Sequence, residues 1–219
     1  MNELKWNTVN SNLRDYLEVL MKSSVFSDFR LVGGTALSLQ LGHRISIDID
    51  LFSDIQYGTI DFTSIENFLD KNFPIVFGSG SDLISFGKSY FIGKTKSDLV
   101  KLDVYSTELF NQDFKIVDGI RLATVEEIAT MKLEVISNGG RKKDFWDLHE
   151  LLEYYSLNEL FDFHKSKYSY VHNRDVLVQN LTNFQRADFE PDPNCLLGKY
   201  WELIKLDLTE LVQKTFIDN

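Results

Sequence analysis

The chain has 219 residues, of which 43% are hydrophobic, and it carries a formal net charge of −10 at pH 7. This length is enough to bury most of the surface that the unfolded chain exposes, so we expect it to fold alone. The negative charge excludes a protein that coats nucleic acid non-specifically, and no biased tract indicates disorder.

No segment has the character of a membrane span or an export signal. The N-terminus lacks an apolar run behind a basic start, and no stretch approaches 18 uncharged apolar residues. Cys195 has no second cysteine to pair with, which agrees with a reducing compartment, and nothing beside it resembles an activating base. We therefore expect a cytoplasmic protein with no membrane partner and an inert thiol.

The first third of the chain predicts alternating helices and strands. Apolar spacing favours a helix over 13–21, and a short strand over 29–32 leads into Gly33-Gly34. A helix capped by Thr35 and stopped by Gly42 follows. In "GHRISIDIDLFSD" strict alternation of apolar and polar residues then predicts a half-buried strand over 45–51.

The middle of the chain predicts one more helix and a meander. Residues 61–72 read as a helix that ends before Pro74. Three segments rich in β-branched or aromatic residues follow and predict antiparallel strands that extend the same sheet. These segments are 74–80, 82–93 and 98–106.

Helical periodicity dominates after Gly119. Thr124 with Glu127 three residues later forms a capping box, and apolar spacing favours helices over 143–155, 157–165, 175–184 and 196–216. The predicted fold class is α+β, with an α/β domain built on a mixed sheet over 1–118 and a helical bundle over 119–219.

The predicted strand at 45–51 has an unusual polar face. Arg44, Ser46, Asp48 and Asp50 share that face, and the two carboxylates lie about 6.7 Å apart along the strand. At an effective dielectric near 20 their charges repel by about 2.5 kcal/mol. Asp103 lies on the polar face of the 98–106 strand, so pairing of the two strands would bring three carboxylates together.

Three clustered carboxylates need cations, and hard oxygen ligands suit Mg²⁺ or Mn²⁺. Two such ions can support an in-line displacement at phosphorus. Gly33-Gly34 ends a strand and opens a helix, so its backbone N–H groups form an anion site suited to a triphosphate. Taken singly, Asp-X-Asp and Gly-Gly are common in ordinary strands and turns, and the combination of the two carries the prediction.

These motifs resemble a known family. "GGTALSLQLGHRISIDIDLF" and "KLDV" are similar to the first and second motifs of the AbiEii/AbiGii-type nucleotidyltransferases, members of the DNA polymerase β-like superfamily. "TVEEIATMKLEVIS" and "RKKDFWDL" resemble its Lys-bearing helix and its Arg-X-Lys-Asp-X-X-Asp motif. The wider superfamily usually has Gly-Ser where this chain has Gly33-Gly34, so a hydroxyl contact to phosphate would come from Thr35.

The resemblance implies transfer of a nucleoside monophosphate from an NTP to an acceptor hydroxyl, with pyrophosphate released. It further implies an RNA acceptor such as a tRNA end, and the toxin role in a toxin–antitoxin or abortive-infection pair with a cognate antitoxin. The implied nucleotide cleft lies between the two halves of the chain. The implied catalytic residues are Asp48, Asp50, Asp103, Lys132 and Asp144, with the metal held by Asp48, Asp50 and Asp103, and the implied nucleotide-binding residues are Gly33, Gly34, Thr35, Arg44, Ser46, Lys132 and Lys143.

Several roles stay open at this point. Lys132 either neutralises phosphate charge or is a solvated surface lysine. Asp144 is the favoured general base, although Asp147 lies three residues on and both could instead form a solvated first turn of a helix. Arg44 either contacts phosphate or holds the carboxylates, and Ser46 either orders the strand or holds a water.

Two other functions compete with transfer to RNA. One is a catalytically silent nucleotide-binding module that acts as an interaction partner. The other is nucleotidyl transfer to a protein or a small molecule. The sequence leaves the preferred NTP, the antitoxin and the oligomeric state undetermined.

Overall fold

The computed structural model describes residues 3–78 and 86–216, which fall into two compact units. The first unit comprises Met1–Gln40 and Ser46–Thr124, and the second comprises Leu41–Ile45 and Val125–Asn219. The chain therefore enters the second unit briefly before it returns to complete the first. Residues 118 and 119, where the sequence places a domain boundary, belong to the first unit.

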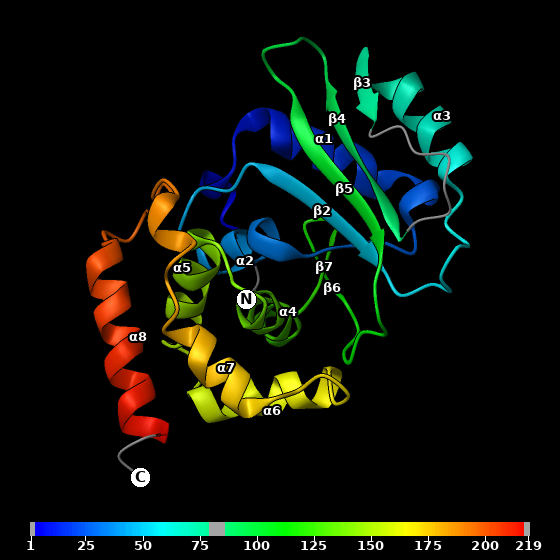
Figure 1. The fold of residues 1–219 in the computed structure, drawn as a ribbon. Coiled ribbons are helices and arrows are strands. Elements are labelled where there is room, and N and C mark those ends of the chain that lie inside the picture. Colours follow the sequence, from blue (N-terminus) through cyan, green and yellow to red (C-terminus); the bar gives the residue numbers. More distant parts are fainter. Residues whose placement is uncertain (1–2, 79–85, 217–219) are drawn as a thin grey trace. The chain divides into compact units, whose positions relative to one another are not determined.

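The first unit is built on a mixed sheet whose seven strands, counted over the described residues, follow the order β3-β4-β5-β2-β1-β7-β6 (Figure 1). The β2/β5 and β1/β7 pairs are parallel, and the other pairs are antiparallel. The strands are β1 (Arg30–Leu31), β2 (Asp48–Ser53), β3 (Ile75–Gly78), β4 (Gly87–Gly93), β5 (Val100–Ser106), β6 (Lys115–Val117) and β7 (Ile120–Leu122). The predicted α+β class and the antiparallel meander β3-β4-β5 are confirmed.

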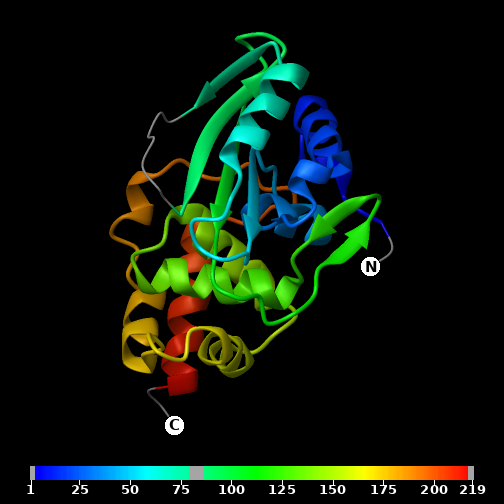
Figure 2. The same cartoon turned by 90° about the vertical axis from the view of Figure 1, so that its right-hand side faces the viewer.

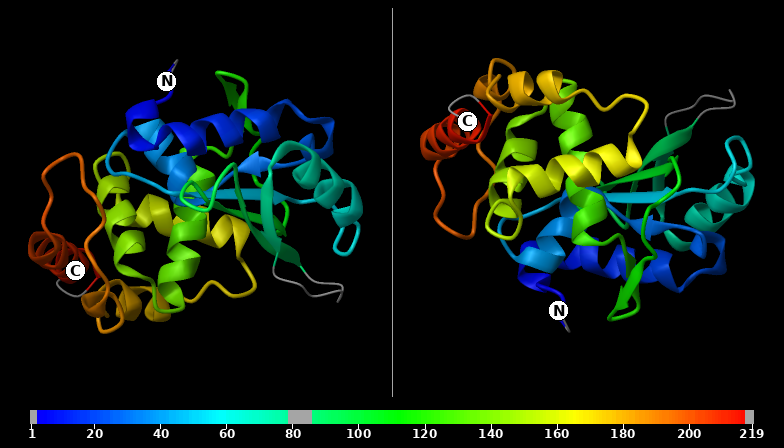
Figure 3. Two further views of the ribbon diagram at one scale, coloured as in Figure 1. Left: turned by 90° about the horizontal axis from the view of Figure 1, so that it is seen from above. Right: turned by 90° about the horizontal axis from the view of Figure 1, so that it is seen from below.

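One face of this sheet is apolar because every second residue of its central strands is apolar. Ile49 and Leu51 of β2, and Leu102 and Val104 of β5, are fully buried. Helix α1 (Ser11–Lys22) contacts β2 and β7 and runs along one side of the sheet (Figure 3), while α3 (Phe62–Asn72) contacts β3. Since strand side chains alternate between faces, the polar residues of β2 and β5 lie on the opposite face.

The β6/β7 hairpin was not predicted. Asp118 and Gly119 form its turn with positive φ angles of 53° and 78°, which is the Asp-Gly pattern of a two-residue hairpin turn. The hairpin lies beside the N-terminal segment (Figure 2), where the Trp6 indole N–H donates to the Asp118 carboxylate at 3.2 Å. The Asp-Gly signal was present in the sequence, but each strand is only three residues long.

The predicted strand at 45–51 is wrong in its first half. β2 begins at Asp48, because the backbone of 43–45 bonds to residues 194–196 of its own unit instead of to β5. Arg44 and Ser46 therefore do not share a strand face with the carboxylates. Helix α2 (Gly33–Leu41) likewise begins at Gly33, so Thr35 lies inside it and does not cap it. Residues 79–80 of the predicted strand 74–80 and residues 82–85 of the predicted strand 82–93 lie outside the described part of the chain.

The second unit is a helical bundle, as predicted. Helix α4 contacts α5, α6 and α7, and α8 contacts α5 and α7 (Figure 2). The indoles of Trp146 and Trp201 stack at 6.5 Å between α5 and α8. The last helix begins at Trp201 and not at 196, because 194–196 is extended against 43–45. The helices are α4 (Val125–Ser137), α5 (Lys142–Leu151), α6 (Leu157–Lys167), α7 (Arg174–Leu181) and α8 (Trp201–Phe216).

A chain of titratable groups joins α4 to α6. The His164 Nε2 lies 2.9 Å from a Glu134 oxygen, and the Nδ1 atoms of His164 and His172 lie 2.9 Å apart. The carboxylate can only accept, so His164 donates to Glu134 and the two Nδ1 atoms share one proton. Burial and the neighbouring His164 and Lys165 lower the pKa of His172, against a smaller opposing effect of Asp162.

We predict that the free energy of unfolding falls as the pH drops below about 6.5, the ordinary pKa of histidine in an unfolded chain. A lowered pKa in the folded state means that the unfolded state binds more protons, so acid favours unfolding. Removing the group by His172→Asn should make this loss shallower. Urea denaturation of both proteins across this pH range measures the two slopes, and equal slopes would contradict the prediction.

Candidate functional site

The parallel pairing of β2 with β5 fixes which polar residues face one another. Asp48 is opposite Lys101, and Asp50 is opposite Asp103. The pairing predicted between the two carboxylate-bearing strands is therefore present. Neighbouring strands lie about 4.8 Å apart, so the side chains of Asp50 and Asp103 are direct cross-strand neighbours. On its other side Asp103 is opposite Ser89 of β4.

Lys101, which is not among the predicted site residues, supplies a cation to this face. The Lys101 Nζ lies 2.6 Å from the Asp103 Oδ2. Burial alone would lower the pKa of Lys101, but its hydrogen bond to Asp103 and the charges of Asp103, Asp48 and Asp50 raise it above its usual value. The alternation of apolar and polar residues along β5 predicts this contact, because it places Lys101 on the same face as Asp103.

The other oxygen of Asp103 is buried, and it has no hydrogen-bond partner among the described residues. A buried carboxylate oxygen without a donor is costly, which makes this atom a candidate ligand for a cation. Across residues 3–78 and 86–216, no group of three or more His, Cys, Asp or Glu side chains is arranged to hold a metal ion. The structure pairs Asp50 with Asp103 and sets Asp48 against Lys101.

The first turn of α2 closely approaches Asp50. A Cβ atom placed on Gly33 would lie 2.5 Å from the Asp50 Oδ2, and the Gly33 φ angle is +67°. The Val32 N–H donates to the Asp50 carbonyl at 2.9 Å. Only glycine satisfies both the backbone conformation and the space. The Gly-Gly turn therefore brings helix-terminal backbone against the carboxylate that pairs with Asp103.

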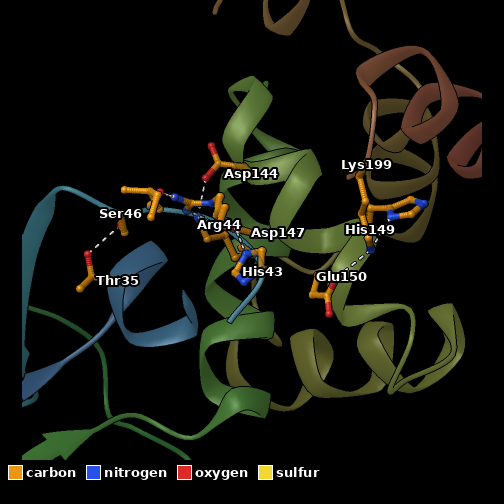
Figure 4. Close-up of polar contacts among 11 residues, drawn as sticks. Thr35, His43, Arg44, Ser46, Asp144, Asp147, His149, Glu150 and Lys199 are labelled. Atoms are coloured by element: carbon orange, nitrogen blue, oxygen red, sulfur yellow. Dashed lines mark hydrogen bonds and ion pairs between the residues drawn. The ribbon is translucent and has the colours of Figure 1, made fainter. Parts of the chain in front are cut away.

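The hydroxyls of Thr35 and Ser46 are turned toward each other (Figure 4). Their oxygens lie 2.8 Å apart, and the Thr35 hydroxyl also donates to the Asp48 carbonyl. Thr35 has one hydroxyl proton, so the Ser46 hydroxyl donates the second bond. Both side chains are buried and tie α2 to the start of β2. Contact of Thr35 or Ser46 with phosphate stays a prediction.

In the second unit, the buried Asp147 carboxylate contacts two of the predicted residues, Arg44 and Lys132 (Figure 4). The Asp147 carboxylate accepts from the Arg44 Nε at 2.6 Å, from the second Arg44 nitrogen at 2.8 Å and from the His43 Nε2 at 2.7 Å. Burial alone would raise the pKa of Asp147, but Arg44 and Lys132 hold it well below its usual range. His43 was missed because its partner lies far along the chain.

Lys132 is buried between two carboxylates and is not a surface lysine. Its Nζ lies 2.7 Å from an oxygen of Asp144 and 2.7 Å from one of Asp147. The other oxygen of Asp144 accepts the Arg141 N–H at 3.0 Å, which closes the first turn of α5. Burial would raise the pKa of Asp144, but Lys132 lowers it. Lys143, half-buried, is the next residue before Asp144.

We predict that Gly33→Ala destabilises the protein more than Gly119→Ala does. Both glycines have positive φ, which costs alanine about 1–2 kcal/mol, but a Cβ on Gly119 meets nothing within 4 Å while one on Gly33 meets the Asp50 carboxylate. Chemical denaturation of the two variants isolates the Asp50 contact. Equal losses of unfolding free energy would contradict the close approach.

A second prediction concerns the buried ion cluster, which consists of Arg44, Lys132, Asp144 and Asp147. Asp147→Asn leaves Arg44 without its charge partner and should cost about 3–5 kcal/mol of unfolding free energy, as expected when one member of a buried pair is removed. The control is Asp207→Asn, which removes an exposed carboxylate that pairs with His149. Because the Asp207 side chain is 56% exposed, water screens its contact with His149, and its loss should cost about 0–1 kcal/mol. Denaturant titration compares the two, and a loss as small as that of the control would contradict the prediction.

In the part of the chain that the structure describes, no helix is both long and apolar enough to cross a membrane. The sequence matches the family described as nucleotidyl transferase AbiEii toxin, type IV TA system, over residues 15–216. A relative, an uncharacterized protein of Aquifex aeolicus strain VF5, is 29% identical over 209 residues, which cover 88% of this chain and 90% of the relative.

Two solved structures have a similar fold. MenT4, a nucleotidyltransferase toxin from Mycobacterium tuberculosis, superposes with a TM-score of 0.59 at 15% identity and covers 94% of this chain and 83% of its own. JHP933 from Helicobacter pylori gives a TM-score of 0.53 at 17% identity, over 96% and 90% of the two chains. The family match spans most of the sequence, and the chain therefore belongs to the AbiEii nucleotidyltransferase toxin family.

Proposed function

We propose that the first unit binds a nucleoside triphosphate with Mg²⁺ or Mn²⁺ and transfers the nucleoside monophosphate to a hydroxyl of RNA. The reaction class is that of the family. The observation that supports this location is the cross-strand pair of Asp50 and Asp103, with a buried Asp103 oxygen that has no partner among the described residues.

Although no three of the described His, Cys, Asp or Glu side chains are grouped as a metal site, the chemistry of the carboxylates on this face suits a hard divalent cation. Asp50 and Asp103 would hold it from adjacent strands, and Asp48 would contribute from two residues earlier on β2. Carboxylate oxygens are the ligands that Mg²⁺ and Mn²⁺ prefer. When bound, such ions neutralise phosphate charge and make an attacking hydroxyl more acidic. The protein's own contribution is to hold the carboxylates on a rigid pair of strands.

The triphosphate would lie against the first turn of α2. Backbone N–H groups at the start of a helix have no intrahelical acceptors, and the helix dipole favours an anion there. Gly33 and Gly34 have no side chains of their own to cover this backbone, and Gly33 already approaches the Asp50 carboxylate. The absence of a Cβ at Gly33 thus serves both the close approach and the anion site.

For the second unit we infer a supporting task. Asp144 has one oxygen on Lys132 and the other on the Arg141 N–H, and its pKa is lowered. A carboxylate in this state is a weak proton acceptor at neutral pH, so we no longer favour Asp144 as the general base. The buried cluster instead fixes the segment 41–45 that joins α2 to β2 along the chain. Nucleotide contacts of Lys132, Arg44 and Lys143 stay predictions.

The proposal of an RNA acceptor comes from the resemblance of the motifs, and the toxin family implies a cognate antitoxin as a second partner. Positive charge is clustered in residues 88–101, which hold Lys88, Lys94, Lys96 and Lys101. Two of these lysines are paired with carboxylates, Lys88 with Glu66 and Lys101 with Asp103. An extended electrostatic surface for nucleic acid is therefore not expected there, and recognition of a short RNA end fits the acidic chain better.

The test is transfer of label from each NTP, labelled at the α or the γ position, to total RNA. We expect label on RNA from the α position alone, reduced by about 10²-fold or more in Asp50→Asn and Asp103→Asn. The control, Asp70→Asn, changes an exposed carboxylate on α3 and should retain transfer.

The other results are equally informative. Label from the α position on protein or on a small molecule would replace RNA as the acceptor. Label from the γ position would indicate a kinase and overturn the reaction class. Absence of label, together with a thermal midpoint that an NTP raises in the presence of Mn²⁺, would favour the silent nucleotide-binding module. Absence of label with a midpoint that no NTP raises would favour an interaction module that does not bind nucleotide at all.

A further inference from the structure

On the polar face of the sheet, the ammonium group of Lys101 lies among the carboxylates of β2 and β5. Lys101 is opposite Asp48 on one side and two residues from Asp103 on its own strand. Its Nζ lies 2.6 Å from the Asp103 Oδ2, whereas the Asp103 Oδ1 is buried and has no hydrogen-bond partner among the described residues. One ammonium group is therefore set among three carboxylates, on the face where the proposed metal would bind.

The Lys101 side chain is 38% exposed, and that of Asp103 is 17% exposed. The ion pair is thus neither fully solvated nor sealed inside the unit. At a half-buried position the attraction between the two charges is only partly screened by water, while the long side chain of lysine can still move. A divalent cation that approaches Asp103 finds one carboxylate oxygen, Oδ2, already bound to Lys101. The positive charge of Lys101 also repels that cation.

We propose that Lys101 is a tethered counter-cation that holds Asp103 in place and makes the site favour a metal–triphosphate complex over the free metal. The proposal rests on the proposed function, since it assumes that the metal and the triphosphate bind on this face. The charge of Lys101 repels a free divalent cation and attracts a polyphosphate. Its removal should therefore change the affinities for the two in opposite directions, which loss of a merely structural contact would not do.

The test uses metal and polyphosphate as separate probes on the full chain. Free Mn²⁺ is counted by electron paramagnetic resonance during titration, and inorganic tripolyphosphate binding is measured calorimetrically in chelator-treated buffer. Lys101→Met keeps most of the apolar length of the side chain and removes its charge. We expect the variant to bind Mn²⁺ about tenfold more tightly and tripolyphosphate about tenfold more weakly, which corresponds to about 1.4 kcal/mol in each case.

Two variants serve as controls. Lys101→Arg keeps the charge and should bind both probes as the unchanged protein does, which also shows that the position tolerates substitution. Lys88→Met removes a lysine of the neighbouring strand β4 whose Nζ pairs with Glu66 at 2.7 Å, and it should leave both affinities unchanged. An Mn²⁺ affinity that is unchanged or weaker in Lys101→Met, with the protein folded by circular dichroism, overturns the proposal.

A further variant separates this outcome from failure of the proposed function. Asp103→Asn removes a ligand, so Mn²⁺ binding should weaken if the metal site is where we place it. If Asp103→Asn weakens Mn²⁺ binding and Lys101→Met has no effect, the site stands and the role of Lys101 is wrong. If Asp103→Asn and the unchanged protein bind Mn²⁺ equally, the proposed metal site fails and the Lys101 proposal fails with it.

Discussion

The in-register parallel pairing of β2 with β5 is the constraint on which the first unit depends. It buries the apolar residues of both strands on one face, and the strict alternation of strand side chains then places Asp50 against Asp103 on the other. A slip of one residue would turn the carboxylates into the core and the apolar residues outward. Hydrophobic burial therefore fixes the geometry of the acidic face.

Local patterns in the sequence were sufficient for much of the fold. Alternation identified β5 and the second half of the strand that bears Asp48 and Asp50, and apolar spacing identified the helices of both units. Contacts between residues distant in sequence were not accessible. Arg44 continues the alternation of β2, but its backbone pairs with Cys195 and its side chain with Asp147. No single-sequence pattern reports either contact.

Lys101 and the buried ion cluster show a second reason why a site is harder to predict than a fold. The charge state of a carboxylate depends on which cation the register or the packing brings to it. Asp103 meets Lys101 of its own strand, and Asp147 meets Arg44 and Lys132. In the cluster two cations balance two carboxylates, and an ion pair of this kind is better attested as a device for structural specificity than as a source of stability.

The path of residues 41–45 has a consequence for any attempt to divide the protein. The helical unit is discontinuous in sequence, because its Arg44 and His43 come from a segment that precedes most of the sheet. A fragment starting at Val125 would be translated without them. It would carry a buried Asp147 lacking two of its donors, and an extended 194–196 segment with an open edge. Expression of the bundle would thus require that short peptide to be supplied again, by fusion or by rejoining the chain ends.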